Sequence, residues 1–322
     1  MNKIINSDWL KNDIPDKSID LIMADPPYFE VKGDFDFIWK SFDDYLKDVE
    51  QWAVECKRVL KDNGSLFWWG HAKKIAYSQI IFDKYFNLEN HLKWEKSECQ
   101  AMKGITVFRS FVPVTEHCLF YSNEVEMTGR EFIEKEYIAH RNPFAKELTR
   151  ARLEKGVSTN QVAEYGHFYG NINHGGSVTN WEKGYSIPLK EQWILIKKHL
   201  PIHKEYDDLR KEYDDLRKEY DDLRRRFNNE YKLSDVIKNS QESNISQLYD
   251  HDTIKPLSLI TKLIQTTTKE GAVVLIPFGG SGTDVEACIN SKRTYICYEI
   301  DNKHYNTIIE REKKCLSQLE LF

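Results

Sequence analysis

The sequence predicts an α/β fold: a doubly wound, mainly parallel sheet, interrupted by a small helical domain and a heptad-repeat helix. Three observations support this prediction. Short apolar runs alternate with stretches of helical periodicity near both ends of the chain. A glycine-rich turn joins one apolar run to the helix that follows it. The middle of the chain instead combines a basic segment with three identical heptads.

The first buried strand is expected over 19–24, because this apolar run stops at two prolines that cannot continue a strand ladder. Asp25 then follows the carboxyl end of that strand. Apolar residues at helical spacing predict a helix over 46–60, with the Asn-Gly pair at 63–64 as its stop. The next strand is expected over 66–69.

The remaining strands and helices continue this alternation. A further strand is expected over 116–121, and a helix opens at Pro256, where proline is well tolerated in a first turn. A strand over 272–276, a helix reaching Asn290 and a strand over 294–298 complete the pattern. Short links between these elements predict parallel strands.

The turn over 277–282 has the sequence PFGGSG and opens a helix. Glycines there leave the backbone N–H groups accessible to a ligand. Glu299 ends the next strand, where a carboxylate is well placed to accept hydrogen bonds from ribose hydroxyls. A tight turn explains the glycines equally well on its own. Together with Glu299, the turn favours a nucleoside cofactor.

The tetrapeptide Asp25-Pro26-Pro27-Tyr28, here called the DPPY segment, is the candidate catalytic motif. A strand end followed by an extended turn explains the prolines, but not the acid before them or the aromatic residue after them. The segment offers a fixed carboxylate, a rigid backbone with free carbonyl groups and a flat aromatic face. These groups suit the exocyclic amine of a flipped nucleobase.

The order of these motifs resembles that of the β-class DNA amino-methyltransferases of restriction–modification systems and phages, which have a Rossmann-like fold. In that family DPPY comes first, a target-recognition region follows, and the cofactor motif comes last. The resemblance covers about 1–125 and 250–310. Its other matching motifs are Asn6-Ser7-Asp8, Thr115-Glu116-His117, Lys255-Pro256 and PFGGSGT.

The resemblance implies S-adenosylmethionine as the methyl donor and an amino group of adenine or cytosine in double-stranded DNA as the acceptor. It implies that Asp25 and the Pro26 carbonyl accept hydrogen bonds from that amine, and that Tyr28 stacks on the extruded base. Orientation and electrostatics would carry the rate without a covalent intermediate. The residues that it implies for cofactor binding are Asp8, Asp25, Lys255, Phe278, Gly279, Gly280, Ser281, Gly282, Thr283 and Glu299.

Two positions depart from the family pattern. Ile276 stands where the family usually has an acidic residue, and Asp284 stands where a second threonine is usual. We expect either Asp284 or Asp25 to supply the negative charge for the donor's ammonium group. If neither does, cofactor binding is weakened.

The composition excludes global disorder and a protein coated in basic surface. Hydrophobic residues make up 40% and aromatic residues 13%, which is enough for a buried core. The net charge is −5, which still allows a local basic face. No apolar run approaches the roughly 20 residues that span a bilayer, and the six cysteines lack metal-ligand spacing. We expect a cytoplasmic protein without a metal or membrane partner.

The segment over 141–200 is the expected target-recognition insert. It holds nine Lys or Arg, five Glu and no Asp, a net charge of +4. Residues 147–188 resemble a phage-repressor-type helix-turn-helix, with a capping box over 158–161 opening the second helix. A helical subdomain that merely braces the fold is the alternative. The candidate base readers are Ser177, Thr179 and Asn180, and the candidate phosphate contacts are Arg150, Arg152 and Lys155.

Three copies of KEYDDLR occupy 204–224 and carry a net charge of −3. Tyrosine and leucine alternate at spacings of three and four residues, which predicts one apolar seam on a helix. A helix lying on its own protein as a spacer is favoured over a self-associating coiled coil. The expected segments are therefore 1–140 and 236–322 for the two halves of the catalytic domain, 141–200 for the insert and 201–235 for the heptad helix.

The leading hypothesis is sequence-specific methylation of adenine N6 in double-stranded DNA, because DPPY accompanies adenine chemistry more often than cytosine chemistry in the family. An N4-cytosine enzyme is the nearest alternative. A catalytically inactive DNA-binding protein that keeps the fold is the other, with Ile276 as its main support. A homodimer and a cognate restriction endonuclease are partners that the family suggests and this sequence leaves open.

Overall fold

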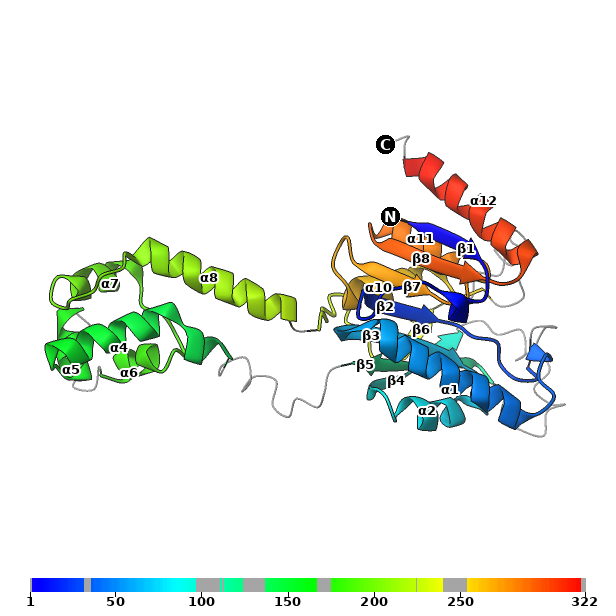
Figure 1. Ribbon diagram of the computed structural model, residues 1–322, viewed down its shortest axis with the longest axis horizontal. Helices are drawn as coiled ribbons and strands as arrows, with labels where there is room; N and C mark the ends of the chain where they lie inside the picture. Colours follow the sequence, from blue (N-terminus) through cyan, green and yellow to red (C-terminus); the bar gives the residue numbers. More distant parts are fainter. Residues whose placement is uncertain are drawn as a thin grey trace. The chain divides into compact units, whose positions relative to one another are not determined.

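The computed structural model describes most of the chain, which forms two compact units (Figure 1). We call Met1–Val125 with Arg225–Phe322 the sheet unit, and Glu126–Arg224 the helical unit. The described residues are 2–31, 36–96, 111, 113–123, 137–166, 175–223, 225–239 and 254–319.

The sheet unit is built on an eight-stranded sheet in the order β1-β8-β7-β2-β3-β5-β4-β6, counted over the described residues. Strands β1, β8, β7, β2 and β3 run parallel, β5 is antiparallel to both β3 and β4, and β6 is parallel to β4. The sheet is therefore mainly parallel, as predicted. The strands are β1 Lys3–Asn6, β2 Ile19–Ala24, β3 Leu60–Gly70, β4 Asn87–Lys96, β5 Thr115–Ser122, β6 Val236–Asn239, β7 Val273–Ile276 and β8 Thr294–Glu299.

Helices cover both faces of this sheet. One face packs against α1 and α2, and the other against α10, α11 and α12. This three-layer arrangement is the doubly wound α/β architecture. The helices are α1 Phe42–Val59, α2 Ile75–Phe82, α10 Leu257–Thr267, α11 Thr283–Asn290 and α12 Asn302–Leu319, with a short 3-10 helix, η1, at Trp9–Lys11.

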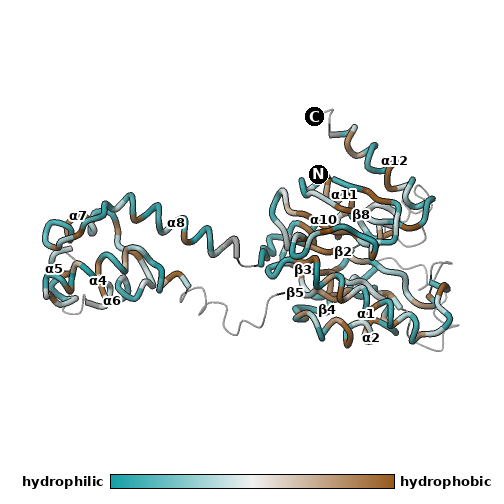
Figure 2. Tube along the Cα trace, viewed as in Figure 1, coloured by the Kyte–Doolittle hydropathy of each residue, from teal (hydrophilic) through white to brown (hydrophobic). Residues whose placement is uncertain are grey.

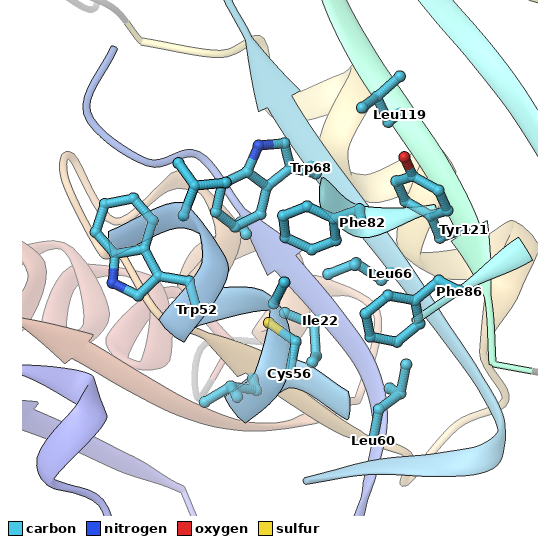
Figure 3. Close-up of a cluster of buried hydrophobic side chains, with 14 of the residues drawn as sticks. Ile22, Trp52, Cys56, Leu60, Leu66, Trp68, Phe82, Phe86, Leu119 and Tyr121 are labelled. Atoms are coloured by element: carbon cyan, nitrogen blue, oxygen red, sulfur yellow. The ribbon is translucent and has the colours of Figure 1, made fainter. Parts of the chain in front are cut away.

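The central strands are apolar on both sides because each face is buried. Along β3, Leu66 and Trp68 join the cluster under α1 and α2, whereas Phe67 and Trp69 join the cluster under α10 and α11. Figure 3 shows Trp68 packed among aromatic and aliphatic side chains from α1, α2 and neighbouring strands. The core therefore fixes the strand ends, where the sequence motifs lie.

Two details of the sheet unit differ from the sequence predictions. The helix α1 ends at Val59 and β3 begins at Leu60, so the Asn-Gly pair at 63–64 lies inside the strand and is not a helix stop. Pairing with β2 passes from Leu60 directly to Ser65, and the Asn123 N–H donates to the Gly64 carbonyl at 3.2 Å. Local turn propensity cannot anticipate this long-range contact. Strands β1, β4 and β6 are not among the elements that the sequence predicts.

The helical unit contains α4 to α8 around one apolar core. Ser158 and Gln161 form the predicted capping box at the start of α5, and Gly156 ends α4 in the left-handed conformation that glycine adopts easily. Asn142 caps α4 and donates to the Gly184 carbonyl at 3.1 Å. The helices are α4 Pro143–Lys155, α5 Thr159–Tyr165, α6 Gly175–Glu182, α7 Lys190–Lys197 and α8 Tyr206–Leu223.

The heptad helix α8 belongs to the core of the helical unit. Its seam residues Leu209, Tyr213, Leu216 and Tyr220 are buried with side chains of α4 and α7, although α8 is largely hydrophilic along its length (Figure 2). The seam thus packs on its own protein. The structure groups 126–224 into one compact unit, in which the seam of α8 shares the core of the insert.

The described segments contain neither a helix long and apolar enough to cross a bilayer nor a cluster of three or more His, Cys, Asp or Glu able to hold a metal ion. Their cysteines are buried and free: Cys56, Cys118, Cys288, Cys297 and Cys315.

Candidate active site

The motifs meet at the carboxyl edge of four neighbouring parallel strands. Asp25 follows β2, and the turn over 277–282 follows β7, the strand paired with β2. On the other side of β7, Glu299 ends β8, directly opposite Asn6 at the end of β1. This edge is where ligands bind in open α/β sheets. Segments more than two hundred residues apart therefore form one site.

Both carboxylate oxygens of Asp25 are engaged. The Tyr28 hydroxyl donates a hydrogen bond to Oδ1, and the Lys255 ammonium lies 2.6 Å from Oδ2. The Tyr28 backbone N–H donates to the carboxylate of Asp36, a buried residue, which closes the loop after the DPPY segment. Asp25 and Tyr28 are thus held in a defined arrangement.

Lys255 connects the DPPY segment to β5. Its side chain is 5% exposed, and its ammonium lies 3.1 Å from Oε2 of Glu116 as well as close to Asp25. The other Glu116 oxygen contacts the Lys96 ammonium at 2.5 Å. Lys255 also lies over the Trp69 ring, 5.0 Å from its centroid. We call Asp25, Lys255, Glu116 and Lys96 the charged cluster.

Within the charged cluster, the ionised forms of Lys255 and Glu116 are stabilised. Burial lowers the pKa of Lys255, but the carboxylates of Asp25 and Glu116 outweigh burial and raise it. Burial likewise raises the pKa of Glu116, but Lys255 and Lys96 outweigh it and lower that pKa to about 2. Burial, with the charges of Asp25 and Glu116, raises the pKa of Tyr28. The tyrosine therefore acts as a neutral hydrogen-bond donor.

The glycine turn is held by the carboxylate of Glu299. The Gly280 N–H donates to one oxygen at 2.8 Å, and the Asp301 N–H donates to the other at 2.8 Å. Gly280 and Gly282 have φ angles of 50° and 78°, a region that glycine adopts without strain. At Gly279 a Cβ atom would lie 2.5 Å from Ile308. The glycines are therefore required by the turn itself.

Arg311 of α12 supports the glycine turn through hydrogen bonds. Its guanidinium donates to the Ser281 carbonyl at 3.0 Å and to the Thr283 hydroxyl at 2.9 Å. The Ser281 and Thr283 hydroxyls are also 3.0 Å apart. These two hydroxyls, predicted as cofactor contacts, are thus part of the internal support of the turn.

Several aromatic side chains pack together beside the glycine turn. Phe278 contacts Trp9, Trp52 and Trp68 edge-to-face, at centroid distances of 6.2, 5.0 and 6.3 Å. Asp8 accepts a hydrogen bond from the Leu10 N–H at 3.0 Å and so caps η1. The indole N–H groups of Trp9 and Trp68 are buried and have no hydrogen-bond partner among the described residues.

The two positions that depart from the family pattern differ in environment. Ile276 is fully buried in the core under α10 and α11. Asp284 is half-buried in the first turn of α11, within electrostatic range of Asp25 and Lys255. Burial and the Asp25 charge raise the pKa of Asp284 to about 7, against the opposing effects of Lys255 and Arg311. A carboxyl group is therefore present near the turn, on the helix instead of the strand.

The predicted base readers lie on α6 of the helical unit. Ser177 and Asn180 are exposed, and Thr179 is partly buried. Val178 and Trp181 on the opposite face enter the core of the unit. The helix therefore presents a polar face to solvent, as a recognition helix requires.

The predicted phosphate contacts have different environments. Lys155 is exposed at the end of α4. Arg150 pairs with Glu147 at 2.8 Å and with Glu154 at 2.6 Å, whereas Arg152 pairs with Glu182 of α6. Arg152 thus connects α4 to α6, and both arginines already have acidic partners.

Sequence reasoning missed several contributors to the site. Lys96, Asp36 and Arg311 carried no motif that marked them. Glu116 and Lys255 lay in recognised motifs, but the ion pairs of Lys255 with Asp25 and with Glu116 were not foreseen because they join residues far apart in the chain. The matched motif Thr115-Glu116-His117 was the only signal that could have pointed to Glu116.

A family profile described as a DNA methylase, N6_N4_Mtase, matches residues 19–310. The type II methyltransferase M.BamHI of Bacillus amyloliquefaciens is 24% identical over 308 residues, which are 94% of this chain and 55% of M.BamHI. The chain thus spans about half the length of that relative. The DNA adenine methyltransferase YhdJ of Escherichia coli strain K12 is 35% identical over 97 residues, which are 28% of this chain and 32% of YhdJ.

Among solved structures, the M1.HpyAVI–SAM complex resembles this chain with a TM-score of 0.52 and 17% identity. The match covers 97% of this chain and 98% of that one. At this identity the similarity concerns the fold, and it agrees with the doubly wound sheet described above.

Proposed function

The chain belongs to the N6/N4 DNA methylase family, and we propose that it methylates the N6 amine of a flipped adenine in double-stranded DNA at a specific sequence. The methyl donor of this family is S-adenosylmethionine. The observation that carries the proposal is the position of Asp25 and Tyr28 after β2, beside the glycine turn that follows the paired strand β7. This proximity supports a base-binding role for the DPPY segment beside a nucleoside-binding role for the turn.

The residues at this edge fit the cofactor. The Gly279 N–H donates to the Tyr298 carbonyl at 2.9 Å and the Gly280 N–H to Glu299, so the turn is fixed against the end of β8 before any ligand binds. Each oxygen of Glu299 accepts one backbone N–H and retains a lone pair for a ribose hydroxyl. Phe278 provides apolar surface, and Trp9, which is buried behind it, has an N–H without a partner among the described residues. When bound, S-adenosylmethionine supplies a methyl group on a positively charged sulfur.

We assign to the DPPY segment the role that the family resemblance implies. Asp25 accepts one hydrogen bond from the target amine and the Pro26 carbonyl accepts the other. Together they favour a pyramidal nitrogen, whose lone pair is less delocalised into the ring. Tyr28 stacks on the base, and Pro27 keeps the segment extended. The protein contributes orientation and electrostatic stabilisation.

Asp284 is the residue that we assign to the ammonium group of the donor. Ile276 cannot carry charge, and Asp25 is already bound by Lys255 and Tyr28. A positively charged ligand group would favour the ionised form of Asp284, whose pKa is raised to about 7 by burial and by the Asp25 charge. The acid that the family usually has on the strand is thus replaced by one on α11.

The helical unit is proposed to read the target sequence. The exposed residues Ser177 and Asn180 on α6 support this role, with Thr179 beside them. The asparagine amide suits the major-groove edge of adenine. Lys155 is the phosphate contact that keeps its charge exposed. Arg150 and Arg152 are proposed to bind phosphates in addition to their observed contacts, in which Arg150 donates to the Pro201 carbonyl and Arg152 connects α4 to α6.

One assay tests the reaction. Double-stranded DNA is incubated with labelled S-adenosylmethionine and then hydrolysed, and the methylated nucleoside is identified. N6-methyladenine supports the proposal, and the similarity to the adenine enzyme YhdJ favours this outcome. N4-methylcytosine would assign the chain to the other branch of the family, which the matching profile also covers. DNA binding without incorporation would identify an inactive DNA-binding protein.

The family also suggests where the protein is located and which proteins it associates with. A cytoplasmic location, a homodimer and a cognate restriction endonuclease remain proposals. The similarity to type II methyltransferases such as M.BamHI supports the endonuclease.

A further inference from the structure

The charged cluster has two carboxylates that compete for one lysine. Lys255 lies 2.6 Å from Asp25 and 3.1 Å from Glu116, and it is almost completely buried. Water therefore cannot readily replace either carboxylate as its partner. Lys96 holds the far oxygen of Glu116 at 2.5 Å and so keeps this carboxylate directed at Lys255.

This arrangement matters because each Asp25 oxygen already has one partner, which leaves a single lone pair on each for the target amine. Oδ1 accepts from Tyr28 and Oδ2 contacts Lys255. A carboxylate held by an ammonium group is also a weaker acceptor for a second donor. An incoming amine therefore gains from any group that draws the lysine away from Asp25.

We propose that Glu116 is a positioning residue that takes over the Lys255 ammonium when the target amine engages Asp25. This inference rests on the proposed methyl transfer. Exchanging one carboxylate partner for another keeps the buried ammonium paired, so the movement costs little. The Trp69 ring, 5.0 Å from Lys255, attracts the ammonium throughout. Glu116 thus acts on the reaction through Lys255 and does not touch the base.

The first experiment compares Glu116→Gln with the matched control Glu95→Gln. Glu95 lies on β4 opposite Thr115, and its only described ion pair is a long one, 3.8 Å from Lys238. In Glu116→Gln, Lys255 keeps Asp25 as its single ionic partner. We expect kcat to fall roughly ten- to a hundred-fold, the range for a lost charge-assisted hydrogen bond, with KM for DNA and Kd for the cofactor unchanged. Glu95→Gln should match the wild type.

A double-mutant cycle with Lys255→Met separates positioning from simple structural support. If Glu116 acts through Lys255, Glu116→Gln should have no further effect on kcat in the Lys255→Met background. If Glu116 only stabilises the fold, its effect on kcat should be the same in both backgrounds. Equal effects would overturn the proposal.

Lys255→Arg provides a test that does not depend on Glu116→Gln folding. The planar guanidinium can bind both carboxylates at once, so it should hold Asp25 fixed and lower kcat at unchanged cofactor affinity. Wild-type kcat in Lys255→Arg would contradict the exchange. If the wild-type protein methylates no DNA, the proposed function itself is rejected, and this inference is rejected with it. If the wild type is active and the Glu116→Gln variant is equally active, only the role of Glu116 is rejected.

Discussion

The sheet unit and the helical unit use charged side chains in different ways. At the edge of the sheet, Lys255 is buried between the carboxylates of Asp25 and Glu116. In the helical unit, pairs such as Lys190–Asp207 lie on the surface, where an ion pair adds little stability. The core of the helical unit is formed by apolar and aromatic side chains.

This difference separates two tasks. A buried set of charges has fixed geometry and strong electrostatic effects, which suit chemistry on a bound base. An exposed polar helix face on an apolar core suits reversible contact with DNA. Substitutions in the sheet unit should therefore change rate or cofactor affinity, whereas substitutions on α6 should change DNA affinity. The predictions below test that separation.

Asp25→Ala should have the largest effect. It removes the acceptor for the target amine and leaves Lys255 without its closest carboxylate. We expect methyl transfer to fall at least about a thousand-fold, because both orientation and charge stabilisation are lost. Labelled-methyl incorporation measures the rate, and calorimetry should find cofactor binding mostly intact. An active Asp25→Ala enzyme would falsify the proposed role.

Asn180→Ala should weaken binding to the target sequence about ten- to a hundred-fold, the range for one base-specific contact. Titration of labelled target and scrambled DNA measures this effect, and kcat at saturating DNA should not change. Asn160→Ala on α5 is the matched control, because Asn160 is also exposed in the same unit. Equal losses on both DNA sequences would show that Asn180 does not read bases.

Asp284→Asn should raise the cofactor Kd about ten-fold, the effect expected for losing one charged contact. Only the ionised carboxylate attracts an ammonium group, and the pKa of Asp284 is raised to about 7 by burial and by Asp25. Wild-type affinity should therefore increase as pH rises through 7, and this increase should be absent in Asp284→Asn. Calorimetry across that range measures it. Glu310→Gln, at an exposed site on α12, should behave as the wild type.

Deleting one KEYDDLR copy should have the smallest effect. The remaining copies are identical in sequence, so the seam re-forms and only the contacts of one copy are lost, such as the ring pair Tyr137–Tyr220. Methyl transfer should stay within about two-fold of the wild type, with a small decrease in Tm. Complete loss of activity in a soluble variant would mean that the length of α8 is itself required.

Much of the fold could be predicted from local patterns. The strand β2 ends where two prolines require it to end, and α10 begins directly after Pro256. The capping box of α5 is formed as predicted, and the fold class is confirmed. These features depend on neighbouring residues, so a single sequence contains the information. The DNA-binding role of α6 stays a prediction.

The remaining features depend on contacts between segments that are far apart in the sequence. The sequence by itself determined the motifs of the candidate site and, except for Asn6-Ser7-Asp8, the element that carries each of them. Only the tertiary structure decided that Lys255 joins Asp25 to Glu116, that Arg311 supports the glycine turn, and that α8 completes the core of the insert. The physical reason is that these contacts join residues far apart in the chain, which local periodicity and capping do not specify.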